Sequence, residues 1–196
     1  MTVGDRHYWR CNHCQATFLA AEQLPGPEFE RERYELHEND PNDDGYRQFL
    51  HRLADPLLSR LAPQQQGLDY GCGAASALKP MFEAAGHSLA LYDPFFFGDR
   101  TPLQHRYDFI TCSEVVEHFH QPASEFDQLR DLLNPGGWLA IMTCFQTEDR
   151  AFANWHYRRH PTHVTFYRQY SFEVIAQQWG YHCEIPRRNV VLLRKA

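Results

Sequence analysis

The chain has 196 residues, a formal net charge of −6 and 43% hydrophobic residues. This length and hydrophobic content suit one domain of moderate size with a real core and a small appendage. The acidic balance offers no broad cationic surface for phosphate backbones, so nucleic acid is not the expected partner. We therefore expect a small-molecule substrate, while these quantities favour no particular oligomeric state.

Membrane and secretory features are not expected in this sequence. No run of about 18 apolar residues is present, and the first residues include Asp5, Arg6 and Arg10, which do not suit a signal peptide. The six cysteines include one close pair, and the chain is too long for a disulfide-stapled secreted domain. We expect reduced thiols and a cytoplasmic location.

Residues 1–25 contain the sequence Cys11-Asn12-His13-Cys14 and are predicted to form a cysteine knuckle. The spacing of Cys11 and Cys14 would allow two thiolates to hold a zinc ion. A full site needs four ligands, and there is no second close cysteine pair. The other ligands would come from a short set of candidates: His7, His37, His160, His163 and Cys183. A zinc site and a knuckle with free thiols both remain possible interpretations.

Residues 26–66 are predicted to form a lid followed by a helix. From Tyr46 to Leu61 the apolar residues follow helical spacing, with Asp43 or Asp44 as the capping residue. Pro56 is expected to kink or divide this helix. The helix would cover one edge of the domain that follows.

From residue 67 onward, strand-like and helix-like segments alternate, which predicts an α/β fold with a doubly wound, mostly parallel sheet. The expected strands are 67–71, 88–92, 107–112 and 138–143, with helices after Ser76, Pro122 and Ser171. Residues 181–185 and 190–193 are predicted to close the sheet as an antiparallel hairpin. Between Asp93 and Asp108 there is room for only a shortened helix and edge strand.

Residues 144–170 have no clear periodicity but are rich in aromatic residues. An irregular segment longer than about 15 residues inside a compact domain is usually functional or disordered, and the aromatic content argues against disorder. We predict that this segment is a substrate cap. Trp155 and Tyr157 could stack on a substrate, or they could simply bury the segment.

The most informative motif is Asp69-Tyr70-Gly71-Cys72-Gly73, followed by Tyr92-Asp93. A strand that ends in Asp-x-Gly-x-Gly and leads into a helix lets a ligand lie against bare backbone. An acid about 20 residues later can bind both hydroxyls of a ribose. The pattern predicts a site for a nucleoside cofactor, although both acids could also be ordinary residues at strand ends.

Four elements occur in the order of a known family. They are Leu68-Asp69-Tyr70-Gly71-Cys72-Gly73, Tyr92-Asp93, Tyr107-Asp108-Phe109-Ile110 through Glu114-Val115-Val116-Glu117-His118, and Leu133-Asn134-Pro135-Gly136-Gly137-Trp138-Leu139. Over residues 67–196 the chain resembles the class I S-adenosylmethionine-dependent methyltransferases, which have a Rossmann-like fold. It departs from their pattern at Ala75, where the usual loop has a third glycine.

The N-terminal part is similar to small bacterial methyltransferases that carry one cysteine pair followed by Tyr-x-x-His-x-Asn. In this chain that motif begins at Tyr34 and includes His37. The likeness fixes no substrate, but we predict that both residues lie on the substrate side, with Trp155 and Tyr157 of the predicted cap.

The resemblance implies S-adenosylmethionine as cofactor, with methyl transfer by in-line attack on its sulfonium methyl group. Gly71 and Gly73 would let its methionyl part approach the backbone. Asp69 would bind its ammonium group, and Asp93 would bind both hydroxyls of its ribose. Tyr92 and Glu114 would complete the cofactor site.

If the acceptor loses a proton, His163 is the first choice for general base and His118 the second. Tyr167, four residues after His163, could face the same direction if that segment is helical. A structural role for each histidine is the alternative.

Two other functions fit part of the pattern. A nicotinamide-dependent oxidoreductase also uses Gly-x-Gly and a later acid, although Ala75 and Asp69 argue against it. A non-catalytic zinc-knuckle module could bind RNA or protein, although the basic residues cluster only at Arg158-Arg159 and Arg187-Arg188.

Overall fold

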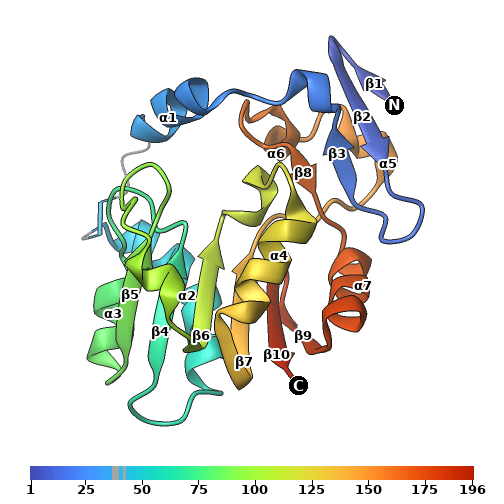
Figure 1. Cartoon of the computed structure of the whole chain (residues 1–196). Helices are drawn as coiled ribbons and strands as arrows, with labels where there is room; N and C mark the ends of the chain where they lie inside the picture. The colour runs from blue at the N-terminus through green and yellow to red at the C-terminus, as the bar shows by residue number, and fades with distance from the viewer. Residues whose placement is uncertain (37–39, 42) are drawn as a thin grey trace.

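A six-stranded sheet in the order β5-β4-β6-β7-β10-β9 organises the chain (Figure 1). In this computed structural model, residues 1–36, 40–41 and 43–196 are described. The strands are β4 (Gln66–Tyr70), β5 (Ser88–Tyr92), β6 (Tyr107–Ser113), β7 (Leu133–Met142), β9 (Tyr181–Arg187) and β10 (Val190–Lys195). The first four strands in this order pair in parallel, and β10 is antiparallel to both β7 and β9. The doubly wound α/β fold with a closing hairpin is confirmed.

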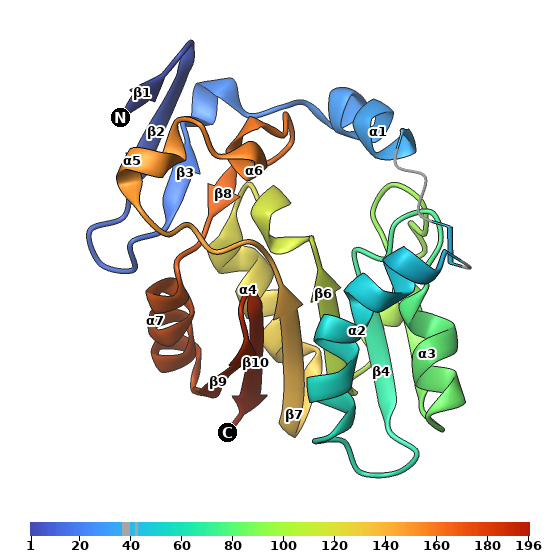
Figure 2. The ribbon, with the colours of Figure 1, turned by 180° about the vertical axis from the view of Figure 1, so that it is seen from behind.

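Helices cover both faces of the sheet (Figures 1 and 2). On one face lie α2 (Asp44–Leu58) and α3 (Leu78–Ala84), and on the other lie α4 (Pro122–Asp131) and α7 (Gln169–Trp179). Because neighbouring strand residues point to opposite faces, Phe109 packs with the first helix pair and Ile110 with the second. Both residues are fully buried.

The helix ends follow the local signals in the sequence. The side chain of Asp43 accepts a hydrogen bond from the backbone N–H of Tyr46 at 2.6 Å, so the predicted cap of α2 is confirmed. The helix continues through Pro56 to Leu58 rather than dividing there. Gly180 ends α7 in the left-handed conformation, with φ of 68°.

The segment between β5 and β6 differs from the prediction. It holds a single turn of 3-10 helix, η2 (Thr101–Gln104), and an isolated bridge between Asp93 and Phe97, so the expected edge strand is wrong. A parallel strand would need a crossover of about a dozen residues or more. This segment is too short for both a crossover and a strand, so β5 remains the edge of the sheet.

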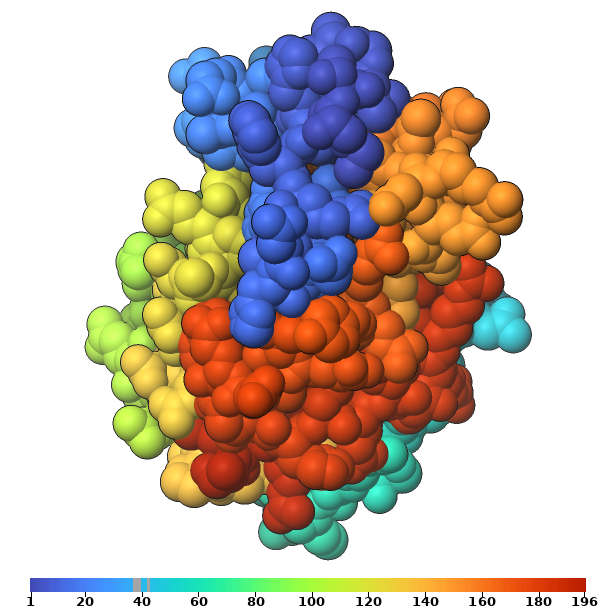
Figure 3. All heavy atoms as spheres, turned by 90° about the vertical axis from the view of Figure 1, so that its right-hand side faces the viewer, coloured from blue at the N-terminus to red at the C-terminus, as the bar shows by residue number. Residues whose placement is uncertain are grey.

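A second, smaller sheet joins two distant parts of the chain. Its order is β1 (Thr2–Val3), β2 (Arg6–Arg10), β3 (Thr17–Leu19) and β8 (Thr165–Phe166). Since β8 belongs to residues 144–170, which we call the cap, the N-terminal segment packs directly against the cap (Figure 3). Their shared cluster includes Tyr8, Leu19, Phe152 and Phe166, all buried.

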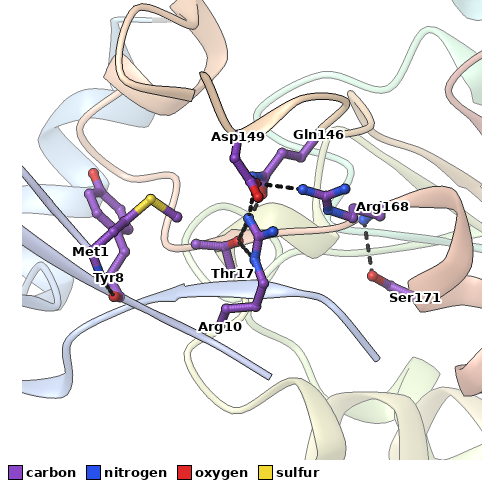
Figure 4. Close-up of polar contacts among 8 residues, drawn as sticks. All are labelled: Met1, Tyr8, Arg10, Thr17, Gln146, Asp149, Arg168 and Ser171. Atoms are coloured by element: carbon purple, nitrogen blue, oxygen red, sulfur yellow. Dashed lines mark hydrogen bonds and ion pairs between the residues drawn. The ribbon is translucent and has the colours of Figure 1, made fainter. Parts of the chain in front are cut away.

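Polar contacts strengthen this junction (Figure 4). Asp149 of the cap lies 2.6 Å from both Arg10 of β2 and Arg168 before α7. The buried hydroxyl of Thr17 donates to Gln146 Oε1 at 2.8 Å. Exposed ion pairs contribute little, typically about 0–1 kcal/mol, so the apolar cluster and the buried hydrogen bond hold the two segments together.

The remaining elements are short. They are η1 (Ala21–Gln23), α1 (Pro27–Glu35), η3 (Val116–His118), α5 (Asp149–Phe152) and α6 (His156–Arg159). Figures 1 and 2 show α1 above the end of the sheet at which the parallel strands stop. Within the described ranges, no helix combines the length and the apolar character that a membrane crossing requires.

The packing at Gly67 generates a stability prediction. A Cβ atom there would lie 2.2 Å from the ring of Phe109 and 2.8 Å from Leu89. We expect Gly67→Ala to lower the free energy of unfolding by about 1–3 kcal/mol, because the buried ring has no space to move into. Urea denaturation measures this change. Gly98→Ala, where the nearest atom is an ordinary 3.7 Å away, is the control, and equal stability of the two variants would contradict the prediction.

Candidate functional site

A cavity of about 940 Å³ opens at the carboxyl ends of the parallel strands. Its wall combines the loop after β4, the turn after β5, the segment after β6, helix α1 and the cap. Ligands of open α/β sheets bind at this end, between two neighbouring strands from which the chain continues toward opposite sides of the sheet. The volume falls in the range of small-molecule sites, about 300–1,000 Å³.

The glycine loop forms one wall of the cavity. Gly71 and Gly73 have φ angles of 76° and 66°, in the left-handed region that glycine tolerates best. A Cβ on Gly71 would lie 2.6 Å from the side chain of Val115, so only glycine fits between these two loops. A Cβ on Gly73 would meet nothing within 4 Å, because this backbone faces the open cavity.

Asp93 connects the glycine loop to the end of β5. Its Oδ2 accepts a hydrogen bond from Gly73 N at 3.0 Å, and its Oδ1 accepts from Phe95 N and Phe96 N at 2.9 and 3.2 Å. The residue is 8% exposed and lines the cavity beside Tyr92. A carboxylate offers about four acceptor positions, so after these three contacts one position, on Oδ2, is still open to a ligand hydroxyl group.

Asp69 lies behind the loop and does not line the cavity. Ser76 and Thr111 donate hydroxyl hydrogen bonds to its two oxygens at 2.6 and 2.7 Å. Burial raises the pKa of Asp69 to about 6, against the opposing effect of the two hydroxyl donors. In this structure Asp69 therefore fixes the start of α3 and the strand beside it.

Two glutamates follow β6. Glu114 lines the cavity and has a φ angle of 55°, a strained conformation for a residue with a side chain. Glu117 is fully buried and accepts hydrogen bonds from Tyr157 at 2.5 Å and Thr143 at 3.0 Å. Burial raises the pKa of both glutamates, and the charge of Glu114 raises that of Glu117 further.

His118 and His163 come together in the cavity wall, with ring centroids 4.8 Å apart. His163 Nδ1 lies 2.8 Å from the carbonyl oxygen of Tyr157, and His118 Nδ1 lies 2.9 Å from that of Thr162. A carbonyl can only accept, so each Nδ1 carries a proton. In the neutral ring, Nε2 is then the basic nitrogen.

Helix α1 covers the cavity through two contacts that the sequence did not reveal. The hydroxyl of Tyr34 lies 3.1 Å from His118 Nδ1, and the buried Glu30 lies 3.0 Å from His120 Nε2. Glu30 is one of several charged residues on a short helix, so no pattern distinguishes it. His37, the other predicted substrate residue of this region, lies outside the described residues.

A family model described as a methyltransferase domain matches residues 42–184. The chain belongs to this methyltransferase family. The match begins beside α2 and ends in β9, so it includes the glycine loop, both glutamates and the cap.

Curated relatives of this methyltransferase match over short segments. A ubiquinone biosynthesis O-methyltransferase of Leptothrix cholodnii is 47% identical over 38 residues, which are 19% of this chain and 16% of the relative. One of Nitrosospira multiformis is 28% identical over 86 residues, or 44% of this chain and 36% of the relative. The chain thus spans well under half of each of these relatives.

Solved structures share the fold of the methyltransferase over most of its length. The 1,6-didemethyltoxoflavin-N1-methyltransferase of Burkholderia thailandensis, with bound 1,6-didemethyltoxoflavin and S-adenosylhomocysteine, has a TM-score of 0.62 at 14% identity. The alignment covers 98% of this chain and 100% of that one. The magnesium protoporphyrin IX methyltransferase of Synechocystis PCC 6803, with bound S-adenosylmethionine, has a TM-score of 0.54 at 14% identity over 90% and 95% of the two chains.

Three aromatic residues predicted for the site occupy different places. Tyr157 lines the cavity, whereas Trp155 packs inside the cap with Tyr157 and Phe166 at centroid distances of 5.2 and 5.9 Å. Tyr167 is buried outside the cavity lining, and its hydroxyl donates to the carbonyl of Val116 at 3.1 Å. The structure therefore separates Trp155 and Tyr167 from the cavity and keeps Tyr157 there.

The cysteine pair lies in the turn between β2 and β3. The backbone N–H of Cys14 contacts Cys11 Sγ at 3.5 Å. Among the described residues, no third histidine, cysteine or carboxylate joins them to form a metal-binding group. A structural zinc site needs four ligands, so the described part of the chain does not complete the predicted one.

The burial of Asp69 predicts a pH dependence of stability. Its pKa rises from an ordinary 3.8 to about 6 on folding, so the folded state binds the proton more tightly. This stabilisation, at most about 3 kcal/mol, is present below pH 4 and is lost as the pH rises through about 6. We expect the stability of Asp69→Asn relative to the wild type to increase between pH 4 and pH 7 in urea denaturation. A pH-independent difference would contradict this assignment.

Proposed function

We propose that this methyltransferase transfers a methyl group from S-adenosylmethionine to a small-molecule acceptor. The observation that carries the proposal is that Gly73 and Asp93, which are 20 residues apart, share a hydrogen bond at the wall of one large cavity. The family match supports the reaction class. The named relatives act on small molecules, which supports the acceptor class.

The charge of the cavity suits a cationic sulfonium compound. The described residues of its lining include four carboxylates and one guanidinium, that of Arg100. The carboxylates are Glu30, Asp93, Glu114 and Glu125. When bound, S-adenosylmethionine would supply an electrophilic methyl group on a positively charged sulfur. Fixed negative charge around a partly closed cavity would favour this cation over neutral ligands.

We assign the cofactor contacts to the residues around the glycine loop. Asp93 would bind the ribose hydroxyls by charge-assisted hydrogen bonds, with Tyr92 beside it. Gly71 and Gly73 would let the methionyl part approach the backbone, and Glu114 would lie near the ammonium group. Asp69 would act indirectly, since its hydroxyl partners hold it behind the loop.

The acceptor would bind between α1 and the cap, beside Tyr34 and Tyr157. His163 is the proposed general base, with His118 as the second choice, because both rings line the cavity. The attacking atom would form its bond to the methyl carbon as the bond from that carbon to sulfur breaks, and the acceptor proton would pass to Nε2. Tyr167 and Trp155 would support this geometry from behind the wall.

Substitution of Asp93 tests the cofactor site. We expect Asp93→Asn to weaken binding of S-adenosylhomocysteine at least tenfold, because charged hydrogen bonds contribute about 1.5–3 kcal/mol each. Isothermal titration calorimetry measures the affinity, with NADH as a second ligand. Glu83→Ala, which removes an exposed ion pair with Lys79, is the control. Unchanged affinity in Asp93→Asn would refute the ribose assignment, and binding of NADH alone would favour an oxidoreductase.

Substitution of His163 tests the proposed base. We expect His163→Asn to slow methyl transfer by about 10²–10⁴ while the affinity for S-adenosylhomocysteine stays within twofold. The assay follows label from methyl-labelled S-adenosylmethionine into a pool of small metabolites. The exposed His105, outside the cavity lining, provides the control variant His105→Asn. Wild-type turnover by His163→Asn would exclude this residue as the base.

A further inference from the structure

Two side chains of the cavity wall, His118 and His163, and the fully buried Glu117 behind it form a candidate metal-binding group. Glu117, His118 and His163 each offer one ligand atom, and these atoms all lie within 4.8 Å of one another. Among the described residues, no other group of three or more histidine, cysteine or carboxylate side chains brings its ligand atoms this close together. Glu117 and His118 belong to η3, and His163 belongs to the cap, so the group joins the methyltransferase sheet to the cap.

The hydrogen bonds of the two histidines prepare them as metal ligands. Each Nδ1 donates to a backbone carbonyl, that of Tyr157 for His163 and that of Thr162 for His118. Imidazole ligands in metal sites characteristically donate the other ring N–H in this way, which fixes the tautomer and the ring orientation. The lone pair of each neutral ring is therefore on Nε2.

The carboxylate of Glu117 is oriented in the same manner. Tyr157 donates to Oε1 and Thr143 donates to Oε2. Two acceptor positions remain on this carboxylate after these contacts. The side chain is fully buried, and the side chains that donate hydrogen bonds to it are two neutral hydroxyls. A bound cation would supply the missing positive charge.

The backbone holds the two ligand-bearing segments together. Val164 N donates to the carbonyl of Glu117 at 2.9 Å, and the hydroxyl of Thr165 donates to the carbonyl of Phe119 at 2.8 Å. These bonds flank the candidate site and place His163 beside η3. Tetrahedral coordination requires ligand atoms about 3.3–3.5 Å apart, so the three side chains, whose ligand atoms lie within 4.8 Å of one another, would have to draw closer when an ion binds.

We propose that Glu117, His118 and His163 bind one divalent transition-metal ion, with Zn²⁺ as the best-matched species. Two imidazole nitrogens and one carboxylate oxygen are the donor set of zinc sites that keep a fourth position open. This set favours Zn²⁺ over Mg²⁺, which prefers oxygen ligands and octahedral geometry. His118 and His163 line the cavity, so the open position faces it.

The ion changes how the two histidines serve the reaction. As ligands they hold the metal, and the metal would lower the pKa of an acceptor hydroxyl bound at the open position. In the metal-bound enzyme the ion therefore takes over the role proposed above for His163 Nε2, and the hydroxyl proton passes to solvent. The acceptor class is then a compound with an ionisable oxygen. The metal site does not depend on the proposed methyl transfer. The assignment of the acceptor class does rest on the proposed methyl transfer.

Metal titration tests the site directly. The chelator-treated full chain is titrated with Co²⁺ and Zn²⁺ against a chromogenic competitor. We expect one ion per chain and a Co²⁺ spectrum without thiolate charge-transfer bands. Glu117→Gln and His163→Asn should each bind the ion at least tenfold more weakly, whereas Cys11→Ser and His105→Asn should bind it as the wild type does. Glu117→Gln keeps a side-chain oxygen that can accept from Tyr157 or Thr143, which limits the damage to folding. His163→Asn leaves the buried Glu117 intact and so tests the site even if Glu117→Gln does not fold.

The outcomes separate the two proposals. Absence of ion binding, or loss of the ion in Cys11→Ser with retention in Glu117→Gln and His163→Asn, overturns the metal site. Calorimetry with S-adenosylhomocysteine on the same samples reports on the proposed function. If that ligand binds with the same affinity with and without metal, a failed metal titration leaves methyl transfer standing. If the ion binds and S-adenosylhomocysteine does not, the metal site stands and the proposed function fails.

Discussion

The hydrogen bond from Gly73 N to Asp93 Oδ2 joins the ends of two neighbouring parallel strands, and the geometry of the cavity depends on it. It requires glycine at position 71, because Val115 occupies the place where a Cβ would lie. It also requires that β5 and β4 pair in register, which brings Tyr92 opposite Tyr70. The central parallel sheet thereby converts a distance of 20 residues in sequence into a direct contact.

The opposite wall of the cavity depends on a different constraint. His163 and Tyr157 belong to the cap, and the cap is held by the N-terminal sheet through β3 and β8. Burial of Tyr8 and Phe166 in the shared cluster fixes this arrangement from outside. Residues far from the cavity therefore position side chains within it, and a change in the N-terminal strands should reach the site through the cap.

The acidic character of the site has a structural cost that the fold accommodates locally. Asp69 and Glu117 are buried, and each is held by two hydroxyl donors rather than by a lysine or arginine. Hydroxyl hydrogen bonds satisfy the oxygens but do not cancel the charge. Both pKa values are raised by burial as a result. Each carboxyl therefore keeps its proton to a higher pH than an exposed one does, and a cation bound nearby would favour the ionised form again.

The sequence by itself determined the succession of most strands and helices along the main domain, the end of α7 at Gly180 and the cap of α2 at Asp43. These features depend on contacts between residues close in the chain, and their residue types carry the signal. Only the tertiary structure decided that Asp69 lies behind the loop, that Tyr167 is buried outside the cavity lining, and that residues 165–166 pair with the N-terminal strands. The meeting of Glu117, His118 and His163 was decided in the same way. Short strands and single buried side chains leave no periodic pattern, because their partners lie more than a hundred residues away or on another element, and only packing brings them together.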